Sequence, residues 1–352
     1  HKEMLTQTPS RWYLTGFLVP TDADEEQRSA ARARTGMTRF DHEFAPIAVV
    51  TRSGIEESLH HGAGAAVDAE GATQAAVGDP ALVVYPRSCL KPMQADAMVD
   101  LGLDLPDELL AVACASHDGA PMHLEAVVTI LSTFGLTEAD LRNTPARSLS
   151  DPCSLEPPSS LRQNCSGKHA AMLATCVVQG WPTASYLDPA HPLQAAIVAH
   201  LGDLGCPVHH VGVDGCGAPT HALALDDLAR VFAVLVSGDV AVARAMRAHP
   251  EMVGGAERDV SLWMSAAPGL MAKEGAAGVM AAALSDGRGV AFKIADGSDL
   301  ARRAVTPEAL RNLGVDVDGA CGDTRDWVAV TTLGHGEPVG RIDALRWTSC
   351  SS

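Results

Sequence analysis

The hydrophobic pattern of this chain changes from strand-like to helical at Ser88. Apolar runs at 46–52 and 81–85, and a hairpin signal over 66–79, are typical of strands. After Ser88, apolar residues recur at helical spacing as far as Gly102. Strand-like patterns return near the C-terminal end, so strands stand at both ends with helices between them. This order predicts an α/β fold of the α+β sandwich type, in which helices pack on an antiparallel sheet.

Residues 45–345 are expected to form one domain, because no internal repeat or long linker divides them. Further helices are predicted at 106–115, 122–134, 167–179, 192–204, 225–236 and 239–249, and further strands at 208–213, 289–294 and 327–332. Residues 1–44 are crowded with charge and show little periodicity, so we interpret them as a flexible extension or an expression remnant. Residues 346–352 are interpreted as a tail.

Composition narrows the classes of function. The 352 residues include 43 acidic and 26 basic side chains, a formal net charge of -17 that repels a phosphate backbone and argues against a nucleic-acid partner. Nine cysteines without regular close spacing fit a reducing compartment better than a disulfide framework. The apolar stretch at 12–20 is too short to span a bilayer. We therefore expect a cytoplasmic protein without membrane association.

Ser88 and Lys91 form an S-x-x-K motif where the strand-like run gives way to a helix. Residues three apart on a helix share a face, so the Lys91 amine is predicted to reach the Ser88 hydroxyl. The helix N-terminus and nearby cations disfavour an ammonium group there, and a neutral lysine would activate Ser88 as a nucleophile. The same helix end would stabilise a tetrahedral oxyanion. A bare match to this motif is more often a helix cap followed by a solvated lysine.

Two other segments carry polar residues that could join such a site. Ser116 would supply a second hydroxyl, with His117 and Gly119 shaping substrate contacts; a helix C-cap with an ordinary histidine is the alternative. Lys273 lies among small and apolar residues, where burial would lower its pKa and allow it to act as a base. A surface lysine that pairs with Glu274 is the alternative for this position.

A metal site is a further candidate. Cys165 and Lys168 are one helical turn apart, and Cys216 stands between two glycines in a second turn. Two thiolates from two such turns could bind zinc, with a deprotonated lysine amine as a third ligand. Two buried thiols without a metal are the alternative. The chain has no CxxC or HExxH motif that would strengthen the metal hypothesis.

Taken together, five segments resemble the rhizobial-type asparaginase II family, which is unrelated to the two-threonine bacterial asparaginases and to the self-cleaving plant-type enzymes. The segments are Arg87-Ser88-x-x-Lys91-Pro92, Ser116-His117, Asn164-Cys165-Ser166-Gly167-Lys168-His169, Asp214-Gly215-Cys216-Gly217 and Lys273-x-Gly275-Ala276-x-Gly278. The resemblance runs from about Ala45 to near Gly340, and the string from Asn164 to His169 is its most specific part.

The resemblance implies a serine β-lactamase-like or penicillin-binding-protein-like fold, a homodimer, and hydrolysis of L-asparagine to L-aspartate and ammonia. It implies two Ser-Lys pairs, a zinc ion completed by water, and two substrate-contacting residues near them. These map onto Ser88 with Lys91, Ser116 with Lys273, the ligands Cys165, Lys168 and Cys216, Arg87 for the substrate α-carboxylate, and Asp214 for its amino group or the metal-bound water.

One departure concerns the second serine segment, which usually reads Ser-His-Ser-Gly-Glu in this family. Here Asp118 and Ala120 replace the second serine and the glutamate, which bears on substrate preference more than on the chemistry. The expected mechanism has Lys91 or Lys273 deprotonate Ser88, which attacks the side-chain amide while Ser116 relays protons.

Two other functions remain open from the sequence. A β-lactamase or D-peptidase of the same architecture would carry a Lys-Thr-Gly or His-x-Gly triplet on a strand, whereas His335-Gly336 follows the last predicted strand. A non-catalytic scaffold that binds zinc and an amino acid is the other alternative, although such a module has no need of lysine bases.

Overall fold

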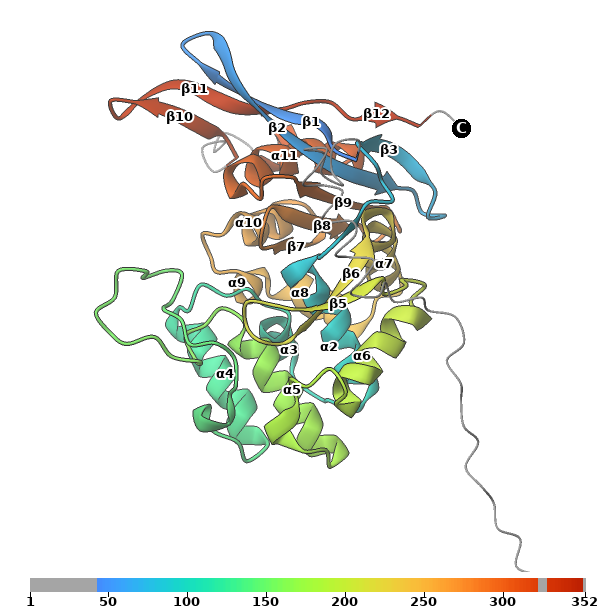
Figure 1. Ribbon diagram of the computed structural model, residues 1–352, viewed down its shortest axis with the longest axis vertical. Coiled ribbons are helices and arrows are strands. Elements are labelled where there is room, and N and C mark those ends of the chain that lie inside the picture. Colours follow the sequence, from blue (N-terminus) through green and yellow to red (C-terminus); the bar gives the residue numbers. More distant parts are fainter. Residues whose placement is uncertain (1–42, 322–327, 351–352) are drawn as a thin grey trace, which may run out of the picture. The chain divides into compact units, whose positions relative to one another are not determined.

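Nine strands of the described chain form one antiparallel sheet. The computed structural model describes residues 43–321 and 328–350, so the extension predicted at 1–44 lies almost wholly outside the described residues. The strands are β1 (Ala45–Arg52), β2 (Ile55–Val67), β3 (Thr73–Val77), β7 (Met271–Gly275), β8 (Val279–Ala283), β9 (Gly289–Ile294), β10 (Val330–Gly334), β11 (Glu337–Ala344) and β12 (Thr348–Ser349). The sheet order is β10-β11-β1-β2-β9-β8-β7, with β3 paired to β2 and β12 to β3 (Figure 1).

β2 lies in the middle of the sheet order, and its two halves pair with different neighbours. Its first half pairs with β1, and its second half lies between β3 and β9. The small residues of the second half permit this crowding. A Cβ on Gly62 would lie 2.9 Å from the Ile47 side chain, and one on Gly64 would lie 2.8 Å from Trp347. The run of glycine and alanine in β2 therefore lets neighbouring side chains pack directly on its backbone.

The helices cover the sheet and form a second group below it in Figure 1. Helix α7 packs on β2, β8 and β9, and α11 packs on β1, β9, β10 and β11. The bounds are α2 (Lys91–Asp100), α3 (Asp107–Ala113), α4 (Pro121–Thr133), α5 (Ser166–Gln179), α6 (Pro192–Asp203), α7 (Leu225–Ser237), α8 (Ala241–Ala248), α9 (Pro250–Val253), α10 (Asp259–Ala266), α11 (Asp299–Asn312) and α12 (Val317–Cys321), with 3₁₀ turns η1 (Arg87–Leu90), η2 (Glu138–Asp140) and η3 (Thr183–Ser185).

The α+β fold class and the six further helices predicted from the sequence are confirmed, each helix to within a few residues. The strand predicted at 289–294 is β9, and the hairpin signal over 66–79 is the β2–β3 turn. His335 and Gly336 form the turn between β10 and β11, so neither lies on a strand.

Two predictions differ from the structure, and several elements were not predicted. The strand predicted at 81–85 shrinks to β4 (Val83–Val84), which belongs to a separate sheet with β5 (His210–Val213) and β6 (Pro219–Ala224). The segment predicted as a tail from residue 346 is partly sheet, since β12 pairs with β3 and the Trp347 side chain is buried. Strands β6, β7, β8 and β11 and helices α9, α10, α11 and α12 were not predicted.

Candidate active site

Arg87 and Ser88 lie in a tight turn that precedes α2. Arg87 has φ 54°, a left-handed conformation that costs a non-glycine residue on the order of 1–3 kcal/mol. Two contacts hold this turn in place. The Arg87 Nε donates to Asp214 Oδ1 at 2.7 Å, and β7 lies so close that a Cβ on Gly275 would overlap the Pro86 carbonyl oxygen. The chain therefore presents Ser88 on a strained backbone that its neighbours fix.

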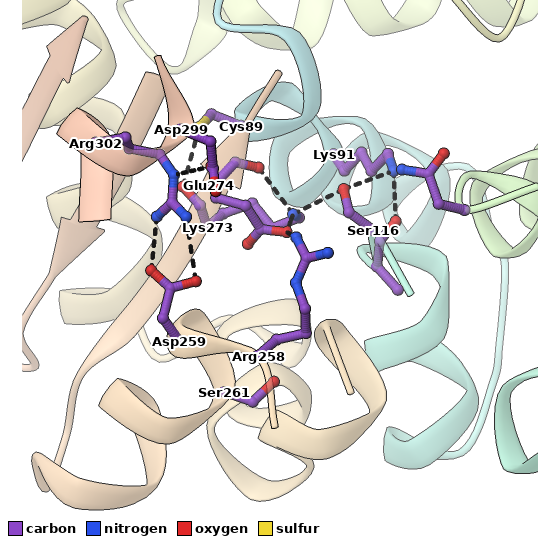
Figure 2. Close-up of polar contacts among 12 residues, drawn as sticks. Cys89, Lys91, Ser116, Arg258, Asp259, Ser261, Lys273, Glu274, Asp299 and Arg302 are labelled. Carbon is purple, nitrogen blue, oxygen red and sulfur yellow. Dashed lines mark hydrogen bonds and ion pairs between the residues drawn. The ribbon is translucent and has the colours of Figure 1, made fainter. Parts of the chain in front are cut away.

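Ser116 lies between two buried lysines (Figure 2). Its Oγ is 2.9 Å from Lys273 Nζ and 3.2 Å from Lys91 Nζ, and Lys91 also donates to the Ala115 carbonyl oxygen. An ammonium group only donates hydrogen bonds, so the hydroxyl proton can pass to a lysine only if that lysine is neutral. Two ammonium groups this close would also repel each other. The arrangement therefore favours one charged and one neutral amine around a shared hydroxyl.

The predicted contact between Lys91 and Ser88 is absent from the described residues. Lys91 Nζ donates to Ala115 O and Ser116 Oγ instead. The spacing argument required both residues on one helix, whereas Ser88 lies in η1 and α2 begins only at Lys91. The structure thus brings together Lys91, Ser116 and Lys273, with the Ser88 hydroxyl free of a hydrogen bond within the described chain.

Lys273 is buried as expected, and it also pairs with Glu274. Its Nζ lies 3.1 Å from Glu274 Oε1, and the same carboxylate oxygen lies 3.2 Å from Arg258 Nη2. Burial lowers the pKa of Lys273, and the adjacent Glu274 opposes that change. The expectation of a buried lysine is therefore confirmed and the surface alternative is wrong, although the pairing with Glu274 that it included is present. The Arg258 contact escaped the sequence analysis because it depends on how α10 docks against β7.

Cys89, next to Ser88, is a buried thiol of low reactivity. Its side chain is fully buried, and Sγ donates to the Lys273 carbonyl oxygen at 3.0 Å. Burial raises the pKa of this thiol to about 12, so the reactive thiolate is scarce at neutral pH. The residue packs η1 against β7.

Cys165, Lys168 and Cys216 form a second buried cluster. Lys168 Nζ lies 3.2 Å from Cys216 Sγ, and a hydrogen bond with Cys216 holds the pKa of Cys165 well below its usual value. Burial opposes the ammonium form of Lys168, but the two sulfurs and Asp214 outweigh it and raise the pKa of that lysine. Within the described residues, no three His, Cys, Asp or Glu side chains gather in a metal-binding group. A metal here would need the Lys168 amine as its third protein ligand.

His117 and Gly119 brace the Ser116 segment. His117 is fully buried, its Nε2 lies 2.8 Å from Ser166 Oγ at the start of α5, and burial holds its pKa well below the usual value. Gly119 has φ 83°, and a Cβ there would overlap the Ser148 side chain. Asp118 accepts a hydrogen bond from Ala120 N at 2.9 Å before α4. These contacts support the backbone, and a substrate contact for His117 or Gly119 stays a prediction.

Asp214 joins the Cys165–Lys168–Cys216 cluster to the Arg87–Ser88 turn. The Asp214 carboxylate is bound to Arg87 Nε, and Lys168 and Arg87 hold its pKa below the usual value against burial, which raises it. The Arg87 Nη groups form no hydrogen bond within the described residues, and the side chain is 30% exposed. The guanidinium therefore keeps donors that could bind a carboxylate.

A comparison with known protein families decides the identity of this arrangement. A family model described as L-asparaginase II matches residues 48–344, which is most of the chain. The chain belongs to the L-asparaginase II family. No curated protein matches the chain.

Membership of the L-asparaginase II family indicates amidohydrolase chemistry on a small-molecule substrate. The matched region contains every site residue discussed above, from Arg87 to Lys273. None of the helices described is long and apolar enough to cross a membrane.

Proposed function

We propose that this chain is an L-asparaginase that hydrolyses L-asparagine to L-aspartate and ammonia, with Ser88 as its nucleophile. The observation that carries the proposal is the Lys91–Ser116–Lys273 chain of hydrogen bonds, which stands one turn from the strained Arg87–Ser88 segment. Strained backbone of this kind clusters at functional sites. Ser88 also has a free hydroxyl among the described residues and is less buried than Ser116, at 8% against 4%.

One charged and one neutral lysine around Ser116 would divide the proton transfers between them. A neutral Lys91 takes the Ser88 proton as Ser88 Oγ attacks the side-chain amide carbon, and for this step its amine must turn from Ser116 toward Ser88. The C–N bond then breaks, and the leaving nitrogen takes a proton that passes from the Lys273 ammonium through Ser116. Water hydrolyses the resulting β-aspartyl ester and returns a proton to the lysines. Arg87 binds the substrate α-carboxylate with its free Nη donors in this scheme.

Zinc fits the second cluster chemically. Two buried sulfurs in one cluster, with a lysine amine 3.2 Å from one of them, supply soft ligands of the kind zinc prefers. Cys165, Lys168 and Cys216 would hold the ion, and it would polarise or orient a bound substrate. Asp214, which is paired with Arg87, would then present its carboxylate to the substrate amino group.

Ammonia release from L-asparagine and L-glutamine by the purified protein tests the proposal. Release from asparagine should fall about a thousandfold or more in Ser88→Ala, because the nucleophile is lost. Ser116→Ala should lose about a hundredfold or more and keep a β-aspartyl adduct on the Ser88 peptide in rapid-quench mass spectrometry. An adduct on the Ser116 peptide of the wild-type protein would reverse the two serine roles.

Ammonia release from neither amide by folded, zinc-loaded protein would contradict the proposed activity. Nitrocefin turnover would then favour a β-lactamase-like enzyme, and binding of asparagine without turnover would favour a scaffold. The expected homodimer and cytoplasmic location stay predictions, which analytical ultracentrifugation and cell fractionation would test.

A further inference from the structure

Glu274 is a buried carboxylate beside the Ser-Lys cluster that none of the proposed steps uses. Its side chain is 6% exposed, and its Oε1 lies 3.1 Å from Lys273 Nζ and 3.2 Å from Arg258 Nη2. Its Oε2 has no hydrogen-bond partner within the described chain. A buried carboxylate is costly unless it is paired, so its two cationic partners account for its presence here. Figure 2 shows that Arg258, Glu274, Lys273, Ser116 and Lys91 form one continuous series of contacts.

The contacts of Lys273 match the donors of an ammonium group. Its Nζ has three oxygen partners, which are Ser116 Oγ at 2.9 Å, Glu274 O at 2.9 Å and Glu274 Oε1 at 3.1 Å. An ammonium group has three N–H donors for these three oxygens, whereas a neutral amine has two and would need the Ser116 hydroxyl to donate to its lone pair. Two of the three partners belong to Glu274. This residue therefore fixes the position of the lysine amine, through its backbone carbonyl oxygen and its carboxylate.

The other charged or titratable groups around Lys273 do not favour the ammonium form. Lys91 on α2 opposes it by like charge, and burial lowers the pKa of Lys273 further. Cys89 on η1 and Cys114 after α3 also face it, but burial raises the pKa of both thiols, so neither supplies a negative charge at neutral pH. Glu274 is thus the anion that opposes these effects.

Arg258 holds Glu274 from the opposite side. It directly precedes α10, its side chain is 32% exposed, and its backbone N–H donates to Gly255 O at 3.1 Å. The next residue, Asp259, forms a buried ion pair with Arg302 of α11 at 2.8 Å, which fixes the start of α10 (Figure 2). The Glu274 carboxylate is therefore held between Lys273, its neighbour on β7, and Arg258 at the start of α10.

We propose that Glu274, anchored by Arg258, is a positioning residue that keeps Lys273 as the ammonium donor to the Ser116 hydroxyl. Glu274 acts through Lys273 and does not touch the reacting atoms. The catalytic consequence, a charged Lys273 ready to protonate the leaving nitrogen through Ser116, rests on the proposed function. The effect on the charge of Lys273 does not.

The charge of Lys273 can be measured directly, because the sequence has only five lysines, at positions 2, 91, 168, 273 and 293. Protein labelled with ¹⁵N-lysine gives few Nζ signals, and the Lys273 signal is assigned by its loss in Lys273→Arg. In Glu274→Gln, which keeps the shape and one acceptor oxygen, the midpoint of the Lys273 titration should move down by about one pH unit or more. Glu274→Asp, which keeps the charge at a greater distance, should show a smaller shift.

Two controls isolate the effect. Lys293, whose Nζ donates to two carbonyl oxygens on β9 and in the β7–β8 turn, should titrate unchanged in the same spectra. Asp299→Asn removes a nearby carboxylate that binds Arg302 rather than Lys273, and it should leave the Lys273 midpoint in place. An unmoved Lys273 midpoint in folded Glu274→Gln, or an equal shift at Lys293, would overturn the proposal.

The activity gives a second readout. If the protein releases ammonia from asparagine, the alkaline limb of kcat/KM should move down in Glu274→Gln together with the Lys273 midpoint, while Asp299→Asn keeps the wild-type profile. A shifted midpoint with an unshifted alkaline limb would show that Lys273 is not the proton donor in turnover. A wild-type protein that releases no ammonia would remove the proposed function and leave the NMR result to decide the role of Glu274.

Discussion

Lys273 and Lys168 are both buried beside a proposed catalytic group, yet their pKa values change in opposite directions. Lys273 is 0% exposed and Lys168 is 2% exposed, and burial is the largest influence on each, disfavouring the ammonium form. Even so, the pKa of Lys273 is lowered and that of Lys168 is raised. The difference lies in the neighbouring charges. Lys273 has one carboxylate and a second lysine near it, whereas Lys168 faces two sulfurs and Asp214.

The comparison shows that burial alone does not decide whether a lysine is a base or a counter-ion. One anion opposed by burial and by a like charge leaves the pKa of Lys273 lowered, which suits a residue that gives up a proton during turnover. Cys165, whose thiol pKa is held low, and the Asp214 carboxylate hold Lys168 as a cation in the absence of a metal. A zinc ion would replace that proton, so zinc binding should release protons and tighten as the pH rises.

Replacing each lysine with methionine should have the largest effects and should separate the roles of the two lysines. Lys273→Met should lower kcat for asparagine about a thousandfold and leave the zinc content unchanged, because it removes a proton donor. Lys168→Met should lower zinc affinity by about a hundredfold or more, because a ligand is lost, and added zinc should restore part of its activity. Ammonia release and metal content by mass spectrometry measure both effects.

Equal loss of zinc in the two variants would contradict the division into two clusters. Circular dichroism must first show that both are folded, since Lys273→Met leaves Glu274 with Arg258 as its one ionic partner. An activity in Lys273→Met that zinc restores would also assign Lys273 to the metal cluster.

Two glycines, one packed beside each cluster, allow the two clusters to be disturbed separately through the backbone. A Cβ on Gly275 would overlap Pro86 O and lie 3.3 Å from Cys89 Sγ, next to Ser88, whereas a Cβ on Gly167 would overlap Val112 O, next to Lys168. Each alanine variant should unfold about 1–3 kcal/mol more easily by urea titration. Gly275→Ala should lower kcat with zinc retained, and Gly167→Ala should lower zinc affinity.

Gly202→Ala is the matched control, because a Cβ there meets no atom within 4 Å and the residue lies in α6. It should leave activity and zinc unchanged and stabilise the protein by up to about 1 kcal/mol. Stability losses of equal size at Gly202 and Gly275 would show that crowding is not the cause.

The sequence predicted which residues gather but not how their side chains pair. Motif order placed Ser88, Lys91, Ser116 and Lys273 in one site, yet the partner of Lys91 proved to be Ser116. Pairing depends on where α2 begins, and a shift of three residues at a helix start is within the uncertainty of a boundary predicted from sequence. Long helices such as α5 were predicted because their apolar face repeats over several turns, whereas β7 and β8 are five residues each and fully buried, without alternation.

The lysine count is a signal that could have singled out Glu274. The sequence has five lysines against twenty-one arginines, so arginine is its usual cation, and three of the five lysines are buried in the candidate site. Where lysine is so rare, a Lys-Glu dipeptide amid small residues indicates a specific pair rather than a solvated surface. Arg258 gave no such signal, because its contact depends on how α10 docks against β7.

The pKa of His200 on α6 depends on the same competition between burial and neighbouring charges, but solvent weakens the charge interactions there. Replacing His200 should therefore change the stability of the protein less than the glycine variants do. Its Nε2 lies 3.0 Å from Asp96 Oδ2 and its Nδ1 3.2 Å from Asp100 Oδ2, both on α2, and Asp203 faces it from its own helix. The hydrogen bond to Asp96 raises the pKa of His200 above 6.5, against burial.

A raised pKa in the folded state gives stability that is fully present below about pH 6.5 and is lost as the pH rises through the folded value. The wild-type protein should therefore exceed His200→Gln in urea midpoint at about pH 6 and lose that advantage by about pH 9, a difference within about 1 kcal/mol because the ring is partly exposed. An advantage that grows with pH would mean that the neutral imidazole, and not its charge, joins α6 to the helix that carries Lys91.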